Sequence, residues 1–553
     1  MQAYPYLFIV TLLTFLSHFL QAQAPIISEI EPQQATVNEV VSIHGSGFGS
    51  DADNLRVLFG AASGQIVSAS DNLLKVSVPA GATIGSVAVV RLDTRLSAYS
   101  PRQFYLSFDG AGFETDRLDG PHTFATSDAG LYNLCMCDFN LDGRVDIATS
   151  DTGNDQVTIL ENSSTDISSV DFTPREIDIN ANTRWVRCHD LNGDGLADLI
   201  FSASNTDSNK ERVYVYQNTS TPGGDIAFAL PNPPLSYTID GTLAARMDIK
   251  DLDGDGKPEL VAVAISSDGG ISVFRNTSSG GSISFEPTFI LPFAQLGISS
   301  VELSGIDLED LDGDGKPEII ASEDERSGVY VLKNASTPGN ISFDGHLSLS
   351  ATGQTTNMRA ADLDGDGLPE VVIVNGAYVG IFKNNSTSGN LAFADAARFD
   401  QTLISREGLE LADMDGNGKL DIIVASTINR IVVLLNNSTA DNLDFNTKRT
   451  ILSSENTLSV RAGDLNGDGK PDLAFTETAS DVVTVQINRN CIRPVLEPQA
   501  GLGVCDQLPY QLSVTRAVDV SYTWEISADG SSFNPIADGS TPTAELRLEM
   551  QKT

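Results

Sequence analysis

Seven short acidic loops recur along this sequence, and their residue types are those that bind divalent cations. One of them, DLDGDGKPE at 251–259, stands again without change at 310–318. Its carboxylates occupy positions 1, 3, 5 and 9, position 7 offers a backbone carbonyl, and the glycine at position 6 permits the positive φ of a sharp turn. Because Ca²⁺ takes about six to eight hard oxygen ligands, these loops predict calcium sites.

All seven loops keep this pattern. Position 1 is always Asp, position 3 is Asp or Asn, position 5 is Asp except for Asn417, and position 9 is Asp or Glu. The residue at position 7 contributes only its backbone carbonyl, whatever its side chain. The predicted metal ligands are Asp138, Asn140, Asp142, Arg144, Asp146, Asp190, Asn192, Asp194, Leu196, Asp198, Asp251, Asp253, Asp255, Lys257, Glu259, Asp310, Asp312, Asp314, Lys316, Glu318, Asp362, Asp364, Asp366, Leu368, Glu370, Asp413, Asp415, Asn417, Lys419, Asp421, Asp464, Asn466, Asp468, Lys470 and Asp472.

A simpler interpretation is that the Asp-Gly and Asn-Gly pairs only form good hairpin turns. Turns do not need several acids within nine residues, and like charges this close repel each other unless a cation lies between them. Mg²⁺ suits the pattern less well, because it demands a tight octahedron and keeps its waters. We therefore expect up to seven structural Ca²⁺ ions, bound more tightly by loops with four acids than by loops with an Asn.

The spacing of the loops indicates a repeated unit of strands that positions them. The loops begin 52, 61, 59, 52, 51 and 51 residues apart. Each is followed by a β-rich run such as ELVAVAI, an alternating run ending in Asn such as ISVFRN, a polar turn and a third strand such as ISFEP. A further strand leads into the next loop, so each unit contains four short strands.

Seven four-stranded units favour an all-β fold, a seven-bladed β-propeller over 108–490, because radial packing hides most sheet edges. The alternative is an open solenoid, whose repeats are usually about 20–47 residues long and need atypical caps. We expect a strand within 106–119 to complete the ring by pairing near 482–488.

The ends of the chain lie outside this period. The apolar run 6–16 and the small-residue pattern Ala22-Gln23-Ala24 predict a signal peptide over 1–24 that is cleaved after Ala24. An uncleaved anchor would need about 18–20 apolar residues, and no later segment is apolar enough to span a membrane. Residues 25–107 predict a small all-β sandwich. Residues 491–553 predict an incomplete second sandwich, as expected for a piece of a longer protein.

The composition excludes several classes of partner. The formal net charge is −40, from 74 acidic and 34 basic residues. The phosphates of nucleic acids and anionic lipid surfaces would be repelled. The charge favours small cations or a solvated acidic surface, and we expect a secreted, extracellular or surface-held protein.

Cysteine and asparagine patterns leave alternatives open. Cys135, Cys137, Cys188 and His189 have the residue types of a zinc site, but buried thiols or a disulfide between neighbouring blades are favoured. Cys491 and Cys505 are candidates for a second pair, or Cys505 has a partner beyond Thr553. Asn-x-Ser/Thr recurs after the alternating strand, which favours a polar turn over a glycan acceptor; the positions are Asn162, Asn218, Asn276, Asn334 and Asn384.

The loops and their flanking strands resemble the FG-GAP/VCBS repeats of integrin α-subunit propellers and of bacterial secreted proteins. The resemblance implies a seven-bladed propeller with Ca²⁺ in hairpin loops on one face. The Phe-Gly and Gly-Ala-Pro landmarks of the repeat are mostly absent, and every unit carries the loop, so the bacterial type is closer. Residues 25–107, with ISEIEPQQATVNEVVSIHGSGFG, resemble an IPT/TIG domain, and 491–553 resemble an Ig-like or PKD-like module.

Three functions fit these observations. The first is a calcium-binding adhesion or recognition protein whose propeller binds an extracellular protein or glycan, with the flanking modules as spacers. The second is an extracellular polysaccharide lyase or hydrolase on the same scaffold, which would need two carboxylates across a cleft outside the loops. The third is a stalk without a ligand. No HExxH, GxSxG or P-loop pattern is present, and we therefore expect a protein that is not an enzyme.

Overall fold

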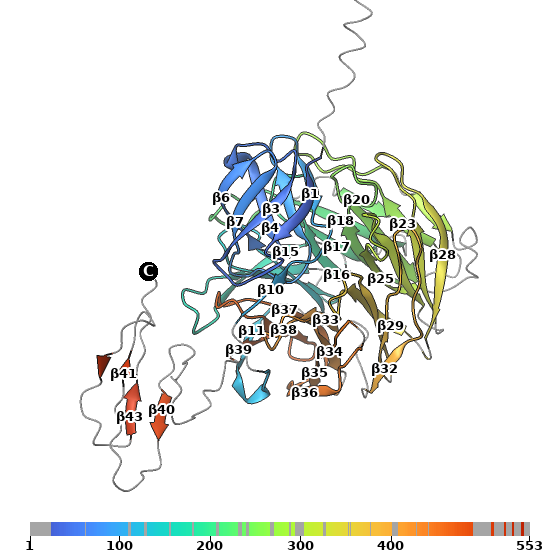
Figure 1. Cartoon of the computed structure of the whole chain (residues 1–553). Helices are drawn as coiled ribbons and strands as arrows, with labels where there is room; N and C mark the ends of the chain where they lie inside the picture. Colours follow the sequence, from blue (N-terminus) through green and yellow to red (C-terminus); the bar gives the residue numbers. More distant parts are fainter. Residues whose placement is uncertain are drawn as a thin grey trace, which may run out of the picture. The chain divides into compact units, whose positions relative to one another are not determined.

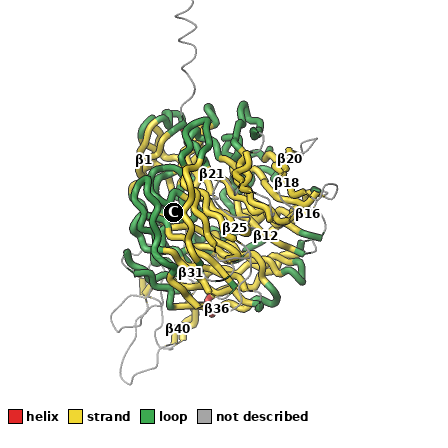
Figure 2. Tube along the Cα trace, turned by 90° about the vertical axis from the view of Figure 1, so that its right-hand side faces the viewer, coloured by secondary structure: helices red, strands yellow, loops and turns green. Residues whose placement is uncertain are grey.

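The computed structural model describes residues 24–489, with short breaks, and four short strands between 510 and 546. The breaks are at 61, 109–111, 127–129, 154–155, 180–181, 206–209, 230–234, 239–242, 266–269, 287–288, 293–302, 324–327, 352, 354, 377, 401–407, 427 and 441. Strands dominate, as Figures 1 and 2 show, and the helices described are two 3₁₀ turns, Ala52–Asn54 and Thr115–Arg117. The expected all-β fold is confirmed. Residues 1–490 form one compact unit and 491–553 another.

Two four-stranded sheets form a sandwich at the N-terminal end. Their strands, in sheet order, are β1 (Ile26–Glu31), β3 (Val40–Ser46), β7 (Leu73–Ser77) and β6 (Gln65–Ser70), and then β5 (Ala62–Ser63), β4 (Leu55–Phe59), β8 (Val87–Arg91) and β9 (Leu96–Tyr99). A short parallel pair, β2 (Gln34–Ala35) and β10 (Tyr105–Leu106), ends the domain. Alternate residues of each strand point inward, and both sheets contribute to one apolar core.

The turn GSGFG at 45–49 shows why glycine is needed there. A Cβ at Gly45 would lie 1.9 Å from the carbonyl oxygen of Ile26, so only glycine allows β1 and β3 to approach each other. Gly47 has a φ of 75°, and this turn brings Phe48 into the core, where it is 1% exposed.

Seven sheets of four or five strands follow, and each begins with the strand that precedes an acidic loop. The strands are β12 (Leu131–Cys137), β13 (Asp146–Asp151), β14 (Gln156–Asn162), β15 (Phe172–Asp178); β16 (Asn182–His189), β17 (Asp198–Asn205), β18 (Lys210–Asn218), β19 (Phe228–Ala229), β20 (Leu235–Thr238); β21 (Leu243–Lys250), β22 (Glu259–Ile265), β23 (Gly270–Phe274), β24 (Phe289–Pro292); β25 (Leu303–Glu309), β26 (Glu318–Glu323), β27 (Gly328–Asn334), β28 (Phe343–Ser350); β29 (Thr355–Ala361), β30 (Glu370–Asn375), β31 (Tyr378–Phe382), β32 (Ala397–Asp400); β33 (Leu409–Ala412), β34 (Asp421–Ser426), β35 (Arg430–Leu435), β36 (Thr447–Leu452); β37 (Thr457–Gly463), β38 (Asp472–Glu477), β39 (Val482–Asn488) and β11 (Leu118–Ala125).

The sheets form a closed ring. Each first strand contacts the first strand of the next sheet, and β37 contacts β12. The last sheet is completed by β11, which pairs antiparallel with β39. The predicted partner, 482–488, is correct, but the closing strand is Leu118–Ala125 rather than a strand within 106–119, because Leu106 already pairs within the N-terminal sandwich.

The predicted third strand is reduced to a single bridge in two sheets, where Asn276 pairs with Phe285 and Asn384 pairs with Phe393. In the sheet that begins with β21, the outer strand β24 starts only at Phe289. In the sheet that begins with β25, the outer strand β28 already includes Phe343, which pairs with Asn334.

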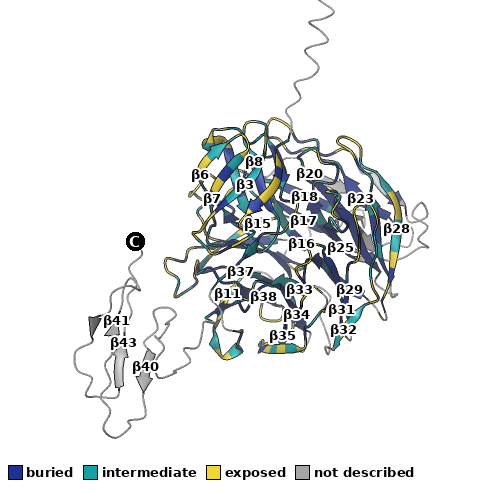
Figure 3. Cartoon of the chain, in the orientation of Figure 1, coloured by how far each residue is buried: buried dark blue, intermediate teal, exposed yellow. Residues whose placement is uncertain are grey.

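The apolar core of the ring lies between neighbouring sheets. Strands β26, β30, β34 and β38 are buried along their whole length, as expected for strands covered on both faces. Exposed residues concentrate on outer strands such as β28 (Figure 3). The ring thereby holds the acidic loops, which follow the first strands, at one end.

The second unit contains four described strands: β40 (Tyr510–Ser513) pairs with β43 (Thr543–Leu546), and β41 (Glu525–Ile526) pairs with β42 (Asn534–Pro535). The predicted signal peptide, Cys491 and Cys505 lie outside the described residues. Among the helices of the described residues, none has the length and hydropathy needed to cross a bilayer.

Candidate metal centres

The first aspartate of each loop organises the turn. Asp251 Oδ1 accepts a hydrogen bond from the Gly254 amide at 2.8 Å, and its Oδ2 accepts one from the Gly256 amide at 2.9 Å. The glycine at position 6 has φ between 79° and 90° in all seven loops, which is the left-handed conformation that glycine adopts without strain. The role predicted for this glycine is therefore the one observed.

Positions 3 and 5 each use one oxygen to hold the loop backbone, and the second oxygen of Asp253 accepts from the Gly339 amide at 2.9 Å. Asp253 Oδ1 accepts from the Asp255 amide, and Asp255 Oδ1 accepts from the Lys257 amide, both at 3.0 Å. In four loops, three carboxylates place ligand atoms within 4.8 Å of one another. These clusters are Asp251, Asp253 and Asp255; Asp310, Asp312 and Glu318; Asp362, Asp364 and Glu370; and Asp413, Asp415 and Asp421.

Three buried oxygens in the loops have no hydrogen-bond partner, namely Asn140 Oδ1, Asp312 Oδ2 and Asp468 Oδ2. Such groups are costly unless something satisfies them. The first two stand at position 3 and the third at position 5, where the sequence predicts metal ligands. A bound cation would satisfy all three oxygens, so the residues fit the predicted metal.

Basic side chains occupy part of this space in at least four loops. Arg275 Nε lies 3.7 Å from Asp253 Oδ2, and Lys470 Nζ lies 3.7 Å from Asp468 Oδ2. Lys383 Nζ contacts the carboxylates of Asp364 and Asp366. The guanidinium of Arg144, at position 7, bonds Asp142 at 2.5 Å and the carbonyl oxygen of Asn162 at 2.8 Å. A cation at these loops would share its carboxylates with the basic side chains.

The position-9 carboxylates are fully buried and bind backbone. Asp146 Oδ2 accepts from the Phe139 amide at 3.0 Å and Oδ1 accepts from the Asn162 amide at 2.8 Å. The same two bonds occur in every loop. This carboxylate therefore joins the start of its loop to the end of the alternating strand of the same sheet, in addition to any contact with a metal.

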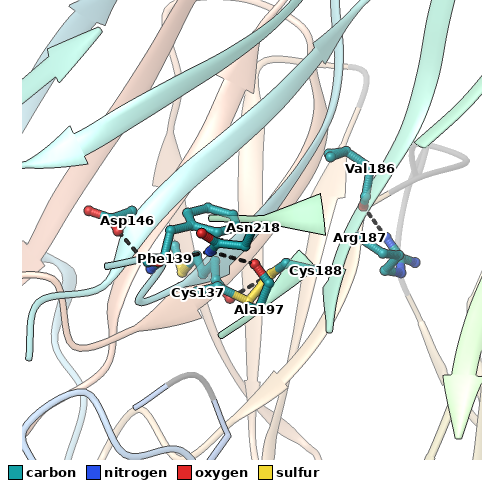
Figure 4. Close-up of a disulfide and its surroundings, with 9 residues drawn as sticks. Cys137, Phe139, Asp146, Val186, Arg187, Cys188, Ala197 and Asn218 are labelled. Atoms are coloured by element: carbon teal, nitrogen blue, oxygen red, sulfur yellow. Dashed lines mark hydrogen bonds between the residues drawn. A yellow bond between two sulfur atoms is a disulfide. The ribbon is translucent and has the colours of Figure 1, made fainter. Parts of the chain in front are cut away.

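The asparagine at the end of each alternating strand joins neighbouring sheets. Asn218 Nδ2 donates to the carbonyl of Ala197 in its own loop and to that of Phe139 in the preceding loop, both at 2.8 Å (Figure 4). We call these seven residues the latch asparagines: Asn162, Asn218, Asn276, Asn334, Asn384, Asn436 and Asn488. All are nearly inaccessible to solvent, which agrees with the polar-turn interpretation and not with glycan attachment.

The environment of the loop carboxylates disfavours their charge. Burial, with the neighbouring loop carboxylates, raises the pKa of Asp251 and Asp413 to about 7 and that of Glu259 to about 9. Backbone amides oppose this rise only in part. At neutral pH these groups either retain protons or need a compensating cation.

The N-terminal sandwich lies against the loops. The Tyr105 hydroxyl donates to Asp362 Oδ2 at 3.0 Å, the Gly81 amide donates to Asp464 Oδ2 at 3.2 Å, and the Ser97 amide donates to the carbonyl of Gly256 at 2.9 Å. The domain expected to act as a spacer therefore also contacts the acidic loops. Pattern analysis of the repeats missed Tyr105 and Gly81, because neither belongs to the repeated unit.

A disulfide between Cys137 and Cys188 joins the first two sheets (Figure 4). Cys135 is buried and free. The disulfide uses two of the thiols of the zinc alternative, and it is the inter-blade pairing that the sequence favoured.

Comparison with known families finds two matches. FG-GAP-like repeats match residues 138–201, 310–373, 362–424 and 413–475, and an IPT/TIG domain matches residues 25–105. Two of the three resemblances seen in the sequence, to FG-GAP repeats and to an IPT/TIG domain, are thus found by the family comparison; the resemblance of 491–553 to an Ig-like or PKD-like module is not. No curated protein matches the chain.

Several solved structures are similar at low identity. BBS1N in complex with ARL6DN is 12% identical, with a TM-score of 0.43, over 67% of this chain and 97% of that chain. An auxiliary nutrient binding protein from Bacteroides ovatus is 11% identical, with a TM-score of 0.32, over 85% and 99%. The Dos1 propeller is 9% identical, with a TM-score of 0.36, over 84% and 95%.

Proposed function

We propose that this chain is a secreted or surface-displayed seven-bladed β-propeller, stabilised by calcium, that binds a protein or glycan. The observation that carries the proposal is the set of acidic loops, whose buried carboxylates converge within 4.8 Å in four sheets. The ring of sheets supplies the rigid frame, and each of the seven sheets would be one blade.

Calcium is assigned to the loops on the chemistry of their donors. Carboxylate, amide and carbonyl oxygens are hard ligands, and a flexible turn accommodates the irregular coordination of Ca²⁺ better than the octahedron of Mg²⁺. When bound, Ca²⁺ supplies the positive charge that the crowded carboxylates need. The chain itself fixes the first aspartate through backbone amides, and the latch asparagines hold each loop against the next.

Export is supported by three features. Residues 1–24 have the pattern of a signal peptide, the Cys137–Cys188 disulfide is of the kind that persists in oxidising compartments, and calcium is plentiful outside cells. We expect the ligand to bind away from the loops, because contacts from Gly81, Ser97 and Tyr105 of the N-terminal domain already cover part of the loop end.

We propose binding rather than catalysis. A hydrolase would need two carboxylates free to act on either side of a bound sugar. Outside the loops, two of the three carboxylates that stand three residues before a loop are paired with arginines: Asp307 lies 3.6 Å from Arg359, and Glu410 lies 3.4 Å from Arg461. These pairings favour a structural or ligand-binding role for the acids over proton transfer.

The experiment is a glycan and protein array probed with the calcium-loaded chain, beside the same chain in EGTA. We expect the chain to bind one class of glycan or protein on the array only in the presence of calcium, and to leave that ligand chemically unchanged. Shortened or unsaturated sugars appearing during incubation would favour the enzyme instead. If neither form retained any ligand, the binding proposal would be contradicted, and a stalk without a ligand would be the remaining function.

A further inference from the structure

The central channel of the ring carries charges at one repeated position. The residue three places before the first aspartate of each loop is charged in six sheets and is cysteine in the first. These residues, which we call the channel ring, are Cys135, Arg187, Asp248, Asp307, Arg359, Glu410 and Arg461. The spacing of this position is regular in the sequence, but its residue type differs from unit to unit, so no sequence motif marks it.

Two of the three ring arginines are paired with carboxylates. Arg359 lies 3.6 Å from Asp307, and Arg461 lies 3.4 Å from Glu410. The Asp307 carboxylate also accepts a hydrogen bond from the Ala360 amide at 2.6 Å. The charges on this part of the ring are therefore balanced locally.

Arg187 is the exception. Its Nη1 donates to Asn133 Oδ1 at 3.3 Å and to the carbonyl of Val186 at 3.0 Å, and no ion pair to Arg187 is found within the described part of the chain. The ring acid on the neighbouring sheet, Asp248, accepts from the Leu308 amide at 3.0 Å instead. Because the first sheet has Cys135 at this position, no carboxylate stands between Arg187 and Arg461.

A cavity of about 300 Å³ opens beside this part of the ring. All three ring arginines line it, and residues 81–84 of the N-terminal domain form part of its opposite wall. Its lining contains two carboxylates, Glu410, which pairs with Arg461, and Asp413, whose oxygens accept amides of its own loop. The cavity thus has an excess of positive charge.

The electrostatics agree with this count. Burial, with the like charges of Arg461 and Arg359, lowers the pKa of Arg187 to about 9. The charge of Asp248 opposes this lowering only in part, and the guanidinium carbon lies 5.7 Å from the centre of the Trp185 ring. A buried charge that is not fully balanced is destabilising.

We propose that this cavity is a binding site for a small oxyanion, held by Arg187 with Arg359 and Arg461 beside it. Guanidinium groups present pairs of N–H donors that match the oxygens of carboxylate and sulfate. A volume of about 300 Å³ is at the lower end for ligand sites, so the ligand is a small ion or a single acidic sugar. The site is distinct from the calcium loops, although Asp413 of one loop belongs to its lining, and it goes beyond the proposed function.

The competing explanation is that Asp248 balances Arg187 at longer range and that the cavity holds only water. The two explanations differ in how the protein responds to anions. Sulfate, acetate and glucuronate are the probes, at constant ionic strength in saturating calcium, with chloride as the reference ion. Glucose serves as an uncharged match for glucuronate, so that free oxyanions and sugar acids are distinguished.

The test compares the wild type with Arg187→Met, which removes the charge at similar volume. The matched control is Arg449→Met, because Arg449 bonds Glu114 on an outer strand away from the cavity. By calorimetric titration we expect wild type and Arg449→Met to bind at least one oxyanion, and Arg187→Met to bind it about tenfold more weakly or not at all. Equal affinities in all three proteins, or no binding by the wild type, would overturn the proposal.

A second measurement keeps the proposal testable if Arg187→Met does not fold. Crystals of the wild type soaked in selenate should show an anomalous peak within hydrogen-bonding distance of the Arg187 guanidinium. Arg187→Lys, which keeps the charge but loses the paired donors, should retain the peak at lower occupancy. A cavity without selenate in crystals that take it up elsewhere would contradict the assignment.

Discussion

Asn162 Nδ2 donates to the carbonyl oxygen of Leu465 at 2.8 Å, across 303 residues of sequence. This bond joins the first sheet to the last and repeats at the ring's closure the contact that each latch asparagine makes with the preceding loop. We expect Asn162→Ala to lower the free energy of unfolding by about 1–3 kcal/mol, because buried carbonyls lose their donor. Urea unfolding in saturating calcium measures this. Asn446→Ala, at an exposed asparagine, is the control and should change little.

Removal of calcium should destabilise the protein, and more so at higher pH. Burial raises the pKa of Asp138 to about 6, of Asp251 to about 7 and of Glu318 to about 8. Without a cation the folded state therefore binds protons more tightly than the unfolded chain, so its stability falls as pH rises from about 4 to about 8. Calcium competes with these protons, and its stabilising effect should grow over the same range.

Thermal melting of metal-free and calcium-loaded protein across this pH range measures both effects. A midpoint that is indifferent to calcium at every pH would refute calcium in the loops. A metal-free midpoint that rises between pH values of about 5 and about 8 would contradict the raised pKa values.

Single loops can be tested through position 3. Asp312 Oδ2 is buried without a hydrogen-bond partner, so Asp312→Asn should weaken one calcium site while leaving the fold intact. We expect calorimetric titration to show one site with at least tenfold lower affinity. Asp344→Asn, at an exposed acid outside the loops, should leave all sites unchanged. An unaltered titration of Asp312→Asn would remove this residue from the ligand set.

The disulfide predicts a redox dependence of stability. Cys137 and Cys188 are 51 residues apart in the sequence, and reduction of the disulfide should lower the free energy of unfolding by about 2–4 kcal/mol. The midpoint of urea unfolding should therefore fall on treatment with dithiothreitol in the wild type and in Cys135→Ala. It should not change in Cys137→Ala, which lacks the bond from the start. A wild type insensitive to the reductant, with its thiols shown to be free, would count against the pairing.

The contact between the N-terminal domain and the loops is also testable. Tyr105→Phe removes the hydroxyl that donates to Asp362, and we expect faster proteolysis within residues 107–117, which connect the domain to the ring. Burial and the charge of Asp362 raise the pKa of Tyr105, so the wild-type contact persists at alkaline pH. Tyr99→Phe is a milder comparison, since its hydroxyl lies 3.4 Å from His189 Nε2. Equal cleavage of all three proteins would show that the hydroxyl does not hold the domain.

Sequence reasoning reached the parts of the fold that repeat. The loops, the strands around them and the conformation of the position-6 glycines follow from local patterns, because the same turn recurs at each unit with the same hydrogen bonds. The recurring asparagine was also visible, and its polar-turn role was the favoured interpretation. Its bond to the preceding loop was not predictable, because it depends on how neighbouring sheets pack.

The features that the sequence did not reveal are those that occur once. Tyr105 reaches Asp362 across 257 residues, and no periodicity marks such a contact. The closing strand was predicted several residues too early, because the chain between 107 and 117 has no strand pattern of its own. The channel ring is periodic in position but not in residue type, so a search for one repeated residue does not find it.

The latch asparagines have a consequence for where this chain can begin. Each sheet makes the same asparagine hydrogen bond to the preceding sheet. These seven bonds therefore form a closed circle in which no sheet is first or last. A circular permutant that links β39 to β11 and opens the chain between two other sheets should fold to the same closed ring. The order of these repeats along the chain could likewise have changed during evolution without a change in any interface between sheets, provided that the ring still closed.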